Sequence, residues 1–268
     1  MNRRQSLGGG GKQNHRLKEE KITPLQADQN NVIINNKFSK REVNMKEGFT
    51  LAEILITLGI IGVVAAMTLP TLIQNKQHRE LETALKKNYS NIQNALNLMN
   101  HDYGETIGPS LKTEEIKPLF IKYFKVAKDC GIGSASCIGH DGDVDEDGTR
   151  FLSKKYRNYN NTYYVWSNKL DDGQFMLQDG AIIFIEKSAQ LNSPFWISVD
   201  VNGFKKGPNR WGHDLFTFQV IDNGKLLPMG ADGTDLDLCS PTDTTAMNGV
   251  GCTYAALTDK NYWKNLPK

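Results

Sequence analysis

The sequence predicts an α+β protein in which one long N-terminal helix packs against an antiparallel β-sheet. Two observations lead to this fold class. The apolar segment 49–69 is followed by an amphipathic segment that keeps the helical period to about residue 100. From Asn161 onward, the chain instead contains short β-branched and aromatic runs separated by turn residues. The helix and the strands therefore occupy different parts of the chain.

The apolar segment from Phe49 to Leu69 is long enough to span a bilayer at about 1.5 Å of rise per residue. Glu53 lies just inside its start, and a carboxylate in such a span is costly enough to indicate a function. An ordinary signal anchor with an interfacial glutamate is the alternative. Small residues, which let helices approach closely or simply face lipid, occur at Gly59, Gly62, Ala65 and Ala66. We expect residues 49–73 to form the transmembrane half of the helix.

Residues 74–100 are expected to form the amphipathic half of the same helix. Apolar side chains recur there at steps of three or four residues, at Leu81, Leu85, Tyr89, Ile92, Leu96 and Met99. This face should pack on the rest of the protein. Pro70 removes a backbone donor and is expected to kink or locally loosen the helix. Gly104 and Gly108 are expected to end it.

Residues 101–268 are expected to form an exported α+β head. A short second helix is predicted near Glu114 to Lys128. Strands are predicted at Thr162–Trp166, Gln174–Gln178, Ala181–Glu186, Phe195–Val201 and Leu215–Ile221. Hairpin turns are indicated beside them by Asp172-Gly173, Asp179-Gly180 and Asn223-Gly224. Such short turns predict antiparallel pairing.

The charge of the chain is small overall but unevenly distributed. The net charge is +2, and residues 1–48 hold ten Lys and Arg against five Asp and Glu. A basic segment before an apolar helix favours a cytoplasmic N-terminus and an exported C-terminal head. The head is mildly acidic, so it lacks the basic surface typical of nucleic-acid binding, and no nucleic-acid partner is expected.

Four cysteines, Cys130, Cys137, Cys239 and Cys252, all lie in the predicted head. An even count in an exported domain indicates disulfides, and three connectivities are open. We favour Cys130–Cys137 and Cys239–Cys252, because each pair brackets a short loop rich in Gly, Ser or Thr. Neither a CxxC spacing nor a nearby histidine supports the alternative of a zinc site.

An acidic loop at Asp143, Asp145, Asp147 and Gly148 matches the start of a calcium-binding loop. The twelfth position of an EF-hand would need a bidentate glutamate, and Lys154 stands there instead. The EF-hand interpretation therefore fails. A looser calcium loop and a solvated acidic loop both remain open.

The segment Gly48-Phe49-Thr50-Leu51-Ala52-Glu53 resembles the cleavage and methylation box of type IV prepilins and type II secretion pseudopilins. In that family, a prepilin peptidase cleaves after the glycine, here Gly48, and methylates the new N-terminal residue, here Phe49. A glutamate five residues into the mature chain corresponds to Glu53, and a proline near position twenty-two corresponds to Pro70. An unhindered Gly48 suits a peptidase that works at the membrane face.

This resemblance implies a pilin-like fold and a structural, non-enzymatic function. The chain would be a subunit of a type II secretion pseudopilus or type IV pilus, anchored once in the inner membrane, with its head in the periplasm or outside. Expected partners are other pilin or pseudopilin subunits, the prepilin peptidase, the inner-membrane assembly platform and inner-membrane lipid. Residues 1–48 would be removed, either as a long leader or as an extension upstream of a true start at Met45.

The same resemblance gives Glu53 a role in assembly. In the family, this glutamate can neutralise the N-terminal amine of a neighbouring subunit as the helices stack. A charge buried in an apolar environment is tolerated when it is paired. Pairing with the amine of Phe49 on a neighbour would therefore favour the assembled state.

A second, looser resemblance to pseudopilin-like proteins runs from Asp200-Val201-Asn202-Gly203 to Gly212-His213-Asp214. Major pseudopilins bind calcium in a loop of the head. Asp200, Asn202 and Asp214 could supply the oxygen ligands here. A turn held by hydrogen bonds from Asp and Asn side chains is the alternative. Filament assembly requires no cofactor, and calcium is the candidate structural ion.

Catalytic motifs are missing from the sequence, which has no GxSxG, no HExxH and no phosphate-binding loop. An enzyme tethered to the membrane is therefore disfavoured. The remaining alternative is a membrane-tethered binding protein, such as a DNA-uptake or adhesive minor pilin. The sequence leaves open whether the system serves secretion, a pilus or competence.

Overall fold

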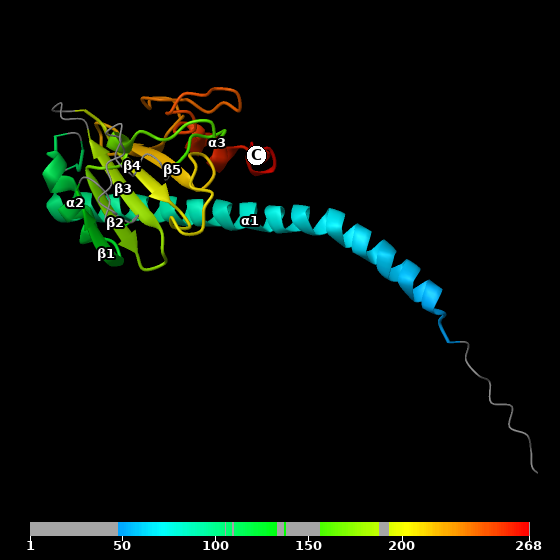
Figure 1. Ribbon diagram of the computed structural model, residues 1–268. Helices are drawn as coiled ribbons and strands as arrows, with labels where there is room; N and C mark the ends of the chain where they lie inside the picture. Colours follow the sequence, from blue (N-terminus) through cyan, green and yellow to red (C-terminus); the bar gives the residue numbers. More distant parts are fainter. Residues whose placement is uncertain are drawn as a thin grey trace, which may run out of the picture. The chain divides into compact units, whose positions relative to one another are not determined.

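The computed structural model describes residues 48–104, 106–108, 110–132, 137, 156–187 and 193–267. It confirms the α+β arrangement, with a long N-terminal helix beside an antiparallel sheet (Figure 1). The helices are α1 (Leu51–Tyr103), α2 (Thr113–Ile121) and α3 (Cys252–Thr258), with short 3-10 turns at η2 (Ser167–Lys169) and η3 (Tyr262–Lys264). The strands are β1 (Val126–Gly131), β2 (Gly173–Leu177), β3 (Ile182–Lys187), β4 (Phe195–Asp200), β5 (Leu215–Val220) and β6 (Leu226–Pro228).

Helix α1 is 53 residues long and runs without interruption through Pro70. The proline does not end the helix, although α1 curves along its N-terminal half (Figure 1). The helix ends at Tyr103, where Gly104 follows with a φ of 69°, a left-handed conformation that glycine adopts easily. The Asn100 side chain then accepts a hydrogen bond of 2.6 Å from the Ile107 backbone N–H.

The two halves of α1 have different surroundings. The predicted apolar stripe of the second half is buried, with Leu85, Ile92, Leu96 and Met99 fully inside the core. Tyr89 is half-buried and stacks on Phe218 of β5 at 5.2 Å between ring centroids. The first half is exposed almost throughout. Within the described residues, α1 packs on the head only from about Leu81 onward, about three turns beyond the apolar segment 49–69.

The sheet has six antiparallel strands, each paired with its neighbours in sequence. Four of the predicted strands correspond to β2, β3, β4 and β5. The predicted turn at Asp179-Gly180 joins β2 to β3, with Gly180 at a φ of 92° and the Asp179 carboxylate accepting from the Ala181 N–H at 3.2 Å. The strands thus form an antiparallel meander. Because successive side chains of a strand point to opposite sides, the sheet has two distinct faces.

Two sequence predictions are wrong. Thr162–Trp166 is not a strand but a turn with one isolated bridge, because the Asn158 carboxamide oxygen accepts the N–H groups of Thr162 at 2.8 Å and Tyr163 at 3.0 Å. The second helix does not reach Lys128. It ends at Ile121, and the backbone from Val126 instead pairs with β2.

Both faces of the sheet are covered. One face packs against α1 and α2 through a core that includes Ile183, Val199 and Phe216. The other face is covered by long loops, whose largest buried side chains are Tyr156 and Trp211. β5 is therefore buried along its whole length. This arrangement also buries both ends of the loop that joins β4 to β5, which carries candidate site residues.

Candidate functional site: the start of α1 and the β4–β5 loop

The predicted cleavage point is accessible in the structure. Gly48, Phe49 and Thr50 have no regular secondary structure and precede the first turn of α1. A Cβ added to Gly48 would contact nothing within 4 Å, and Phe49 is 85% exposed. A peptidase could therefore reach the bond between them. Residues 1–47 of the expected leader lie outside the described residues.

Glu53 lies in the first turn of α1 and is exposed. A carboxylate there interacts favourably with the partial positive charge of a helix N-terminus. The apolar part of α1 is long and apolar enough to cross a membrane, and none of its strongest 18-residue window is buried against the head. The structure thus presents an apolar helix whose first turn carries one carboxyl group.

The cysteines lie in the two pairs expected from the sequence. Cys130 at the end of β1 is joined to Cys137, with 5.2 Å between their Cα atoms. Cys239 is joined to Cys252, with 4.8 Å between their Cα atoms. The second disulfide ties a long surface loop to the first residue of α3. It therefore holds this loop beside α3, which contacts β5.

The β4–β5 loop begins at Asp200, the last residue of β4, whose side chain is completely buried. Its carboxylate accepts hydrogen bonds from the Tyr156 hydroxyl at 2.7 Å, the Gly203 N–H at 2.8 Å and the Asn202 N–H at 3.3 Å. Gly203 has a φ of 81°, and an added Cβ would collide with the carbonyl of Gly180. The turn after β4 therefore depends on both Asp200 and Gly203.

The loop ends at Asp214, which is also completely buried. Its two carboxylate oxygens accept the backbone N–H groups of Asn209 and Arg210, both at 2.8 Å. Burial raises the pKa of Asp200 and of Asp214, and the charge of Asp200 raises the pKa of Asp214 further. The two carboxyl groups, one at each end of the loop, are therefore close enough for the charge of one to affect the other.

Asn202 lies between them and donates a hydrogen bond of 2.8 Å to the Gly207 carbonyl. Its side-chain oxygen, and that of Asn209, are buried without a hydrogen-bond partner among the described residues. Asp200, Asn202 and Asp214 thus belong to one loop, as the calcium hypothesis requires. The hydrogen bonds of these three side chains, however, go mainly to the backbone of the loop, as expected for the alternative, a turn held by Asp and Asn side chains. The other candidate ligands, Asp143, Asp145 and Asp147, lie outside the described residues.

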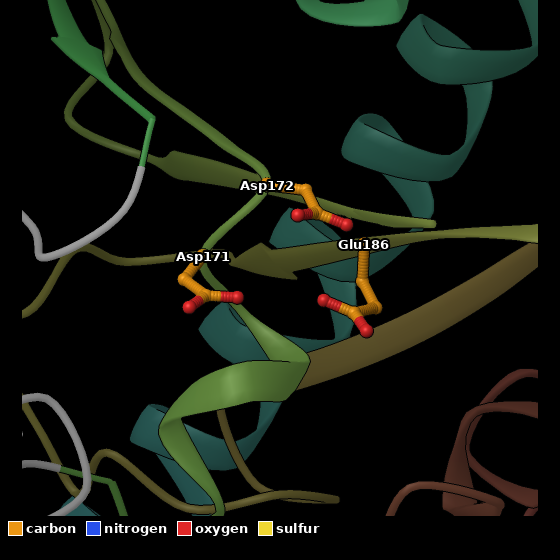
Figure 2. A group of neighbouring side chains, drawn as sticks. All are labelled: Asp171, Asp172 and Glu186. Atoms are coloured by element: carbon orange, nitrogen blue, oxygen red, sulfur yellow. The ribbon is translucent and has the colours of Figure 1, made fainter. Parts of the chain in front are cut away.

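A second acidic group was not predicted from the sequence. Asp171, Asp172 and Glu186 place their carboxylate oxygens within 4.8 Å of one another, and Asp171 and Glu186 point toward each other in Figure 2. Three such carboxylates could hold a divalent cation. The Lys169 ammonium already lies 3.6 Å from Glu186, and Asp172 accepts the Lys187 N–H at 2.8 Å. Burial and the charge of Asp172 raise the pKa of Glu186 to about 7.

His213, beside Asp214, serves the packing of the head. Its Nε2 lies 3.0 Å from the Tyr159 carbonyl oxygen. Burial lowers the pKa of His213 to about 4, so the ring is neutral near pH 7. Its ring also packs against the Tyr159 ring, at 5.4 Å between centroids, so its contacts are those of a packed side chain.

Comparison with known proteins addresses the start of α1 directly. The family model described as the prokaryotic N-terminal methylation motif matches residues 43–69. Over 91 residues, the chain is 31% identical to the type II secretion system core protein G of Escherichia coli strain K12. These matches support a pilin or pseudopilin family for the chain. The second match covers 32% of this chain and 62% of the relative, so the chain spans less than two thirds of that pseudopilin. No solved structure matches.

Proposed function

We propose that the chain is a structural subunit of a pilin-type filament, either a type II secretion pseudopilus or a type IV pilus. One observation carries the proposal: the methylation motif coincides with an exposed Gly48–Phe49 bond at the start of an apolar helix. The similarity to a type II secretion pseudopilin supports the same class. That family is structural rather than enzymatic, and its members work by assembling with one another.

The proposed mechanism begins at the inner membrane. The basic residues before Gly48 keep the N-terminus in the cytoplasm, and the apolar half of α1 crosses the bilayer. The prepilin peptidase cleaves after Gly48 and methylates Phe49. The assembly platform then extracts the helix into a filament, where packed α1 helices form the centre and the heads form the surface.

Glu53 provides the electrostatic link between subunits in this proposal. It follows Phe49 by four positions, so about one helical turn lies between the amine and the carboxylate of one chain. In a filament with staggered helices, the Phe49 amine of one subunit can reach Glu53 of its neighbour. The pair forms only on assembly, and each charge then has an opposite charge beside it in the apolar centre of the filament.

Mass spectrometry of the protein extracted from the membranes of a peptidase-containing host tests the proposal. We expect an N-terminal peptide that begins with N-methylated Phe49. A Gly48→Val variant should remain uncleaved, because the branched side chain hinders the bond, and it serves as the unprocessed reference. Recovery of wild-type protein that still carries residues 30–48 would contradict the proposed processing.

A further inference from the structure

A pocket lies between α1 and the head where the apolar segment ends. Its volume is about 940 Å³, and its lining includes Pro70 and Gln74 of α1 and Lys206 and Arg210 of the β4–β5 loop. Pro70 directly follows the apolar segment 49–69, whose length at about 1.5 Å per residue matches a hydrocarbon core of about 30 Å. If α1 spans the membrane, as proposed above, the pocket opens at the surface of the bilayer.

The level of the pocket along α1 agrees with the position of lipid headgroups. Headgroups occupy roughly 5 to 8 Å on each side of the hydrocarbon core. Gln74 follows Pro70 by about one helical turn, or about 5.4 Å along the axis. The α1 side of the pocket therefore extends through the headgroup layer. The pocket also has apolar lining from Ile73 of α1 and Leu266 near the C-terminus.

The acidic side chains at the pocket are already paired. Glu80 lies 3.6 Å from the Lys76 ammonium, one turn earlier on α1. Asp179, in the β2–β3 turn, lies 2.7 Å from the Lys87 ammonium. Each carboxylate thus has its own lysine, and neither needs a cation from a ligand.

The two basic side chains of the β4–β5 loop at the pocket differ from these acidic side chains in their ion pairing. Within the part of the chain that the structure describes, no ion pair joins Lys206 or Arg210 to a carboxylate. Arg210 is half-buried and attracted toward the Asp214 carboxyl, whereas Lys206 is exposed. Lysine and arginine side chains bind phosphate through charge-assisted hydrogen bonds. The charges of the pocket therefore favour an anionic ligand.

We propose that this pocket binds the headgroup of an anionic phospholipid from the membrane that anchors α1. The phosphodiester accepts hydrogen bonds from Lys206 and Arg210, and the acyl chains continue along the apolar half of the helix. This contact holds the head against the membrane before assembly. It is lost when α1 is extracted into the filament. The inference rests on the proposed function, because it requires that α1 span a bilayer.

The test uses the full chain in nanodiscs of equimolar phosphatidylglycerol and phosphatidylcholine, and it measures by native mass spectrometry which lipids stay bound. We expect phosphatidylglycerol to be enriched among the lipids retained by the wild-type protein. In the Lys206→Gln/Arg210→Gln variant, the enrichment should fall by roughly fivefold or more, the loss expected for removing basic residues at a membrane surface. Because Lys206 is exposed, the single Lys206→Gln variant should fold normally and show part of the loss.

A matched control removes the same charge from the opposite end of the head. Two lysines lie near the C-terminal end of α1. Lys122 is next to Tyr123, whose hydroxyl donates a hydrogen bond to Asp102 of α1. Lys225 is next to Gly224, which lies close to Thr106, just after α1. This end lies about 27 Å along α1 from Ala84 and about 42 Å from Gln74 of the pocket, beyond the reach of screened charge interactions. The Lys122→Gln/Lys225→Gln variant should therefore retain the wild-type enrichment.

The outcomes separate this inference from the proposed function. Release of the wild-type chain from membranes by alkaline carbonate would contradict membrane anchoring and with it the proposed function. An inserted protein without phosphatidylglycerol enrichment, or with equal enrichment in the Lys206→Gln/Arg210→Gln variant, would overturn the lipid pocket alone. Displacement of the bound lipid by soluble glycerol phosphate at equal concentration would instead identify a site for free anions.

Discussion

Glu53 is the residue on which the proposed assembly depends most directly. We expect Glu53→Ala to leave membrane insertion intact, because the substitution removes a charge from an apolar segment. It should reduce incorporation into filaments, because the Phe49 amine of a neighbouring subunit loses the carboxylate that neutralises it. Filaments sheared from cells in which the variant is the sole copy give the measurement.

Glu82→Ala provides the matched control for that experiment. Glu82 also lies on α1 but forms an exposed pair with Lys86 at 2.6 Å. Exposed pairs of this kind contribute little to stability, so assembly should not change. Wild-type incorporation of Glu53→Ala would refute the proposed role of the glutamate.

The half-buried carboxyl of Glu186 predicts a dependence of stability on pH. Its pKa of about 7 in the folded protein lies above the ordinary value for glutamate, so the folded state binds more protons than the unfolded state between these values. The free energy of unfolding therefore decreases as the pH rises from about 5 to about 8, by roughly 1 to 3 kcal/mol from this group.

Glu186→Gln should remove this contribution, because an amide does not titrate. We expect the melting temperature of the wild-type chain, measured in detergent with a chelator, to fall relative to that of the variant as the pH is raised. Glu115→Gln is a suitable control, since Glu115 is an exposed residue in the first turn of α2. A constant difference between the wild-type and Glu186→Gln melting temperatures would show that Glu186 titrates normally.

At this scale, sequence reasoning can recognise contiguous motifs. Gly48, Phe49 and Glu53 could be identified because their spacing along the chain alone defines the motif, and the family match covers the same residues. The acidic group around Glu186 could not. Asp171 and Asp172 precede β2, whereas Glu186 lies within β3. They come together only because β2 pairs with β3, and the periodicity of neither segment reveals that contact.

At the scale of elements, the second half of α1 was predictable because helical periodicity identifies the buried face. Leu96 is fully buried and Leu98 is 53% exposed, although only two positions separate them. We expect Leu96→Ala to lower the free energy of unfolding by about 2 to 5 kcal/mol through lost burial and a cavity. Leu98→Ala should change it by less than about 1 kcal/mol, because a side chain that stays largely exposed gains little from folding.

Chemical denaturation of the full chain in detergent, followed by circular dichroism, measures both variants under the same conditions. The comparison isolates burial from helix propensity, since both substitutions replace leucine with alanine in one helix. Equal effects of the two substitutions would mean that the apolar stripe of α1 does not pack on the head as the structure shows.

The two elements that sequence reasoning placed wrongly have a common cause. In Thr162–Trp166, the β-branched and aromatic residues favour a strand, but the Asn158 side-chain oxygen accepts two backbone N–H groups and holds the backbone in a turn. After Ile121, the helical pattern of apolar residues continues through Phe124, yet β1 pairs with β2 only a few residues later. Side-chain capping and long-range pairing both override local propensity, and neither can be seen in a window of sequence.

At the scale of the whole molecule, both faces of the sheet in the head are covered. Helices α1 and α2 cover one face, and long loops cover the other. This explains why Asp200 and Asp214 are buried although they lie in a loop between strands. The Cys239–Cys252 link and the hydrogen bonds around Asn248 hold the covering loops in place. The sequence indicated four strands of the sheet, β2 to β5, but not that its second face would be covered.

Calcium binding is the prediction that concerns the head as a whole. Asp200 and Asp214 bring two buried carboxyl groups into one loop, and the Asn202 and Asn209 oxygens are buried there without a recorded partner. Oxygen ligands of this kind suit calcium. An ion that binds only the folded head raises its melting temperature by mass action, by about 2.7 kcal/mol in free energy of unfolding at a hundred times the dissociation constant.

We therefore expect the full chain in detergent to melt several degrees higher in millimolar calcium than in chelator. Asp200→Asn and Asp145→Asn, compared separately, identify the responsible loop, since Asp145 belongs to the second candidate set in residues that the structure does not describe. Loss of the calcium effect in Asp200→Asn alone would assign the ion to the β4–β5 loop. Coincident melting curves with and without calcium would mean that both loops are ordinary turns, with the Asp200 and Asp214 carboxylates serving only the hydrogen bonds that the structure shows.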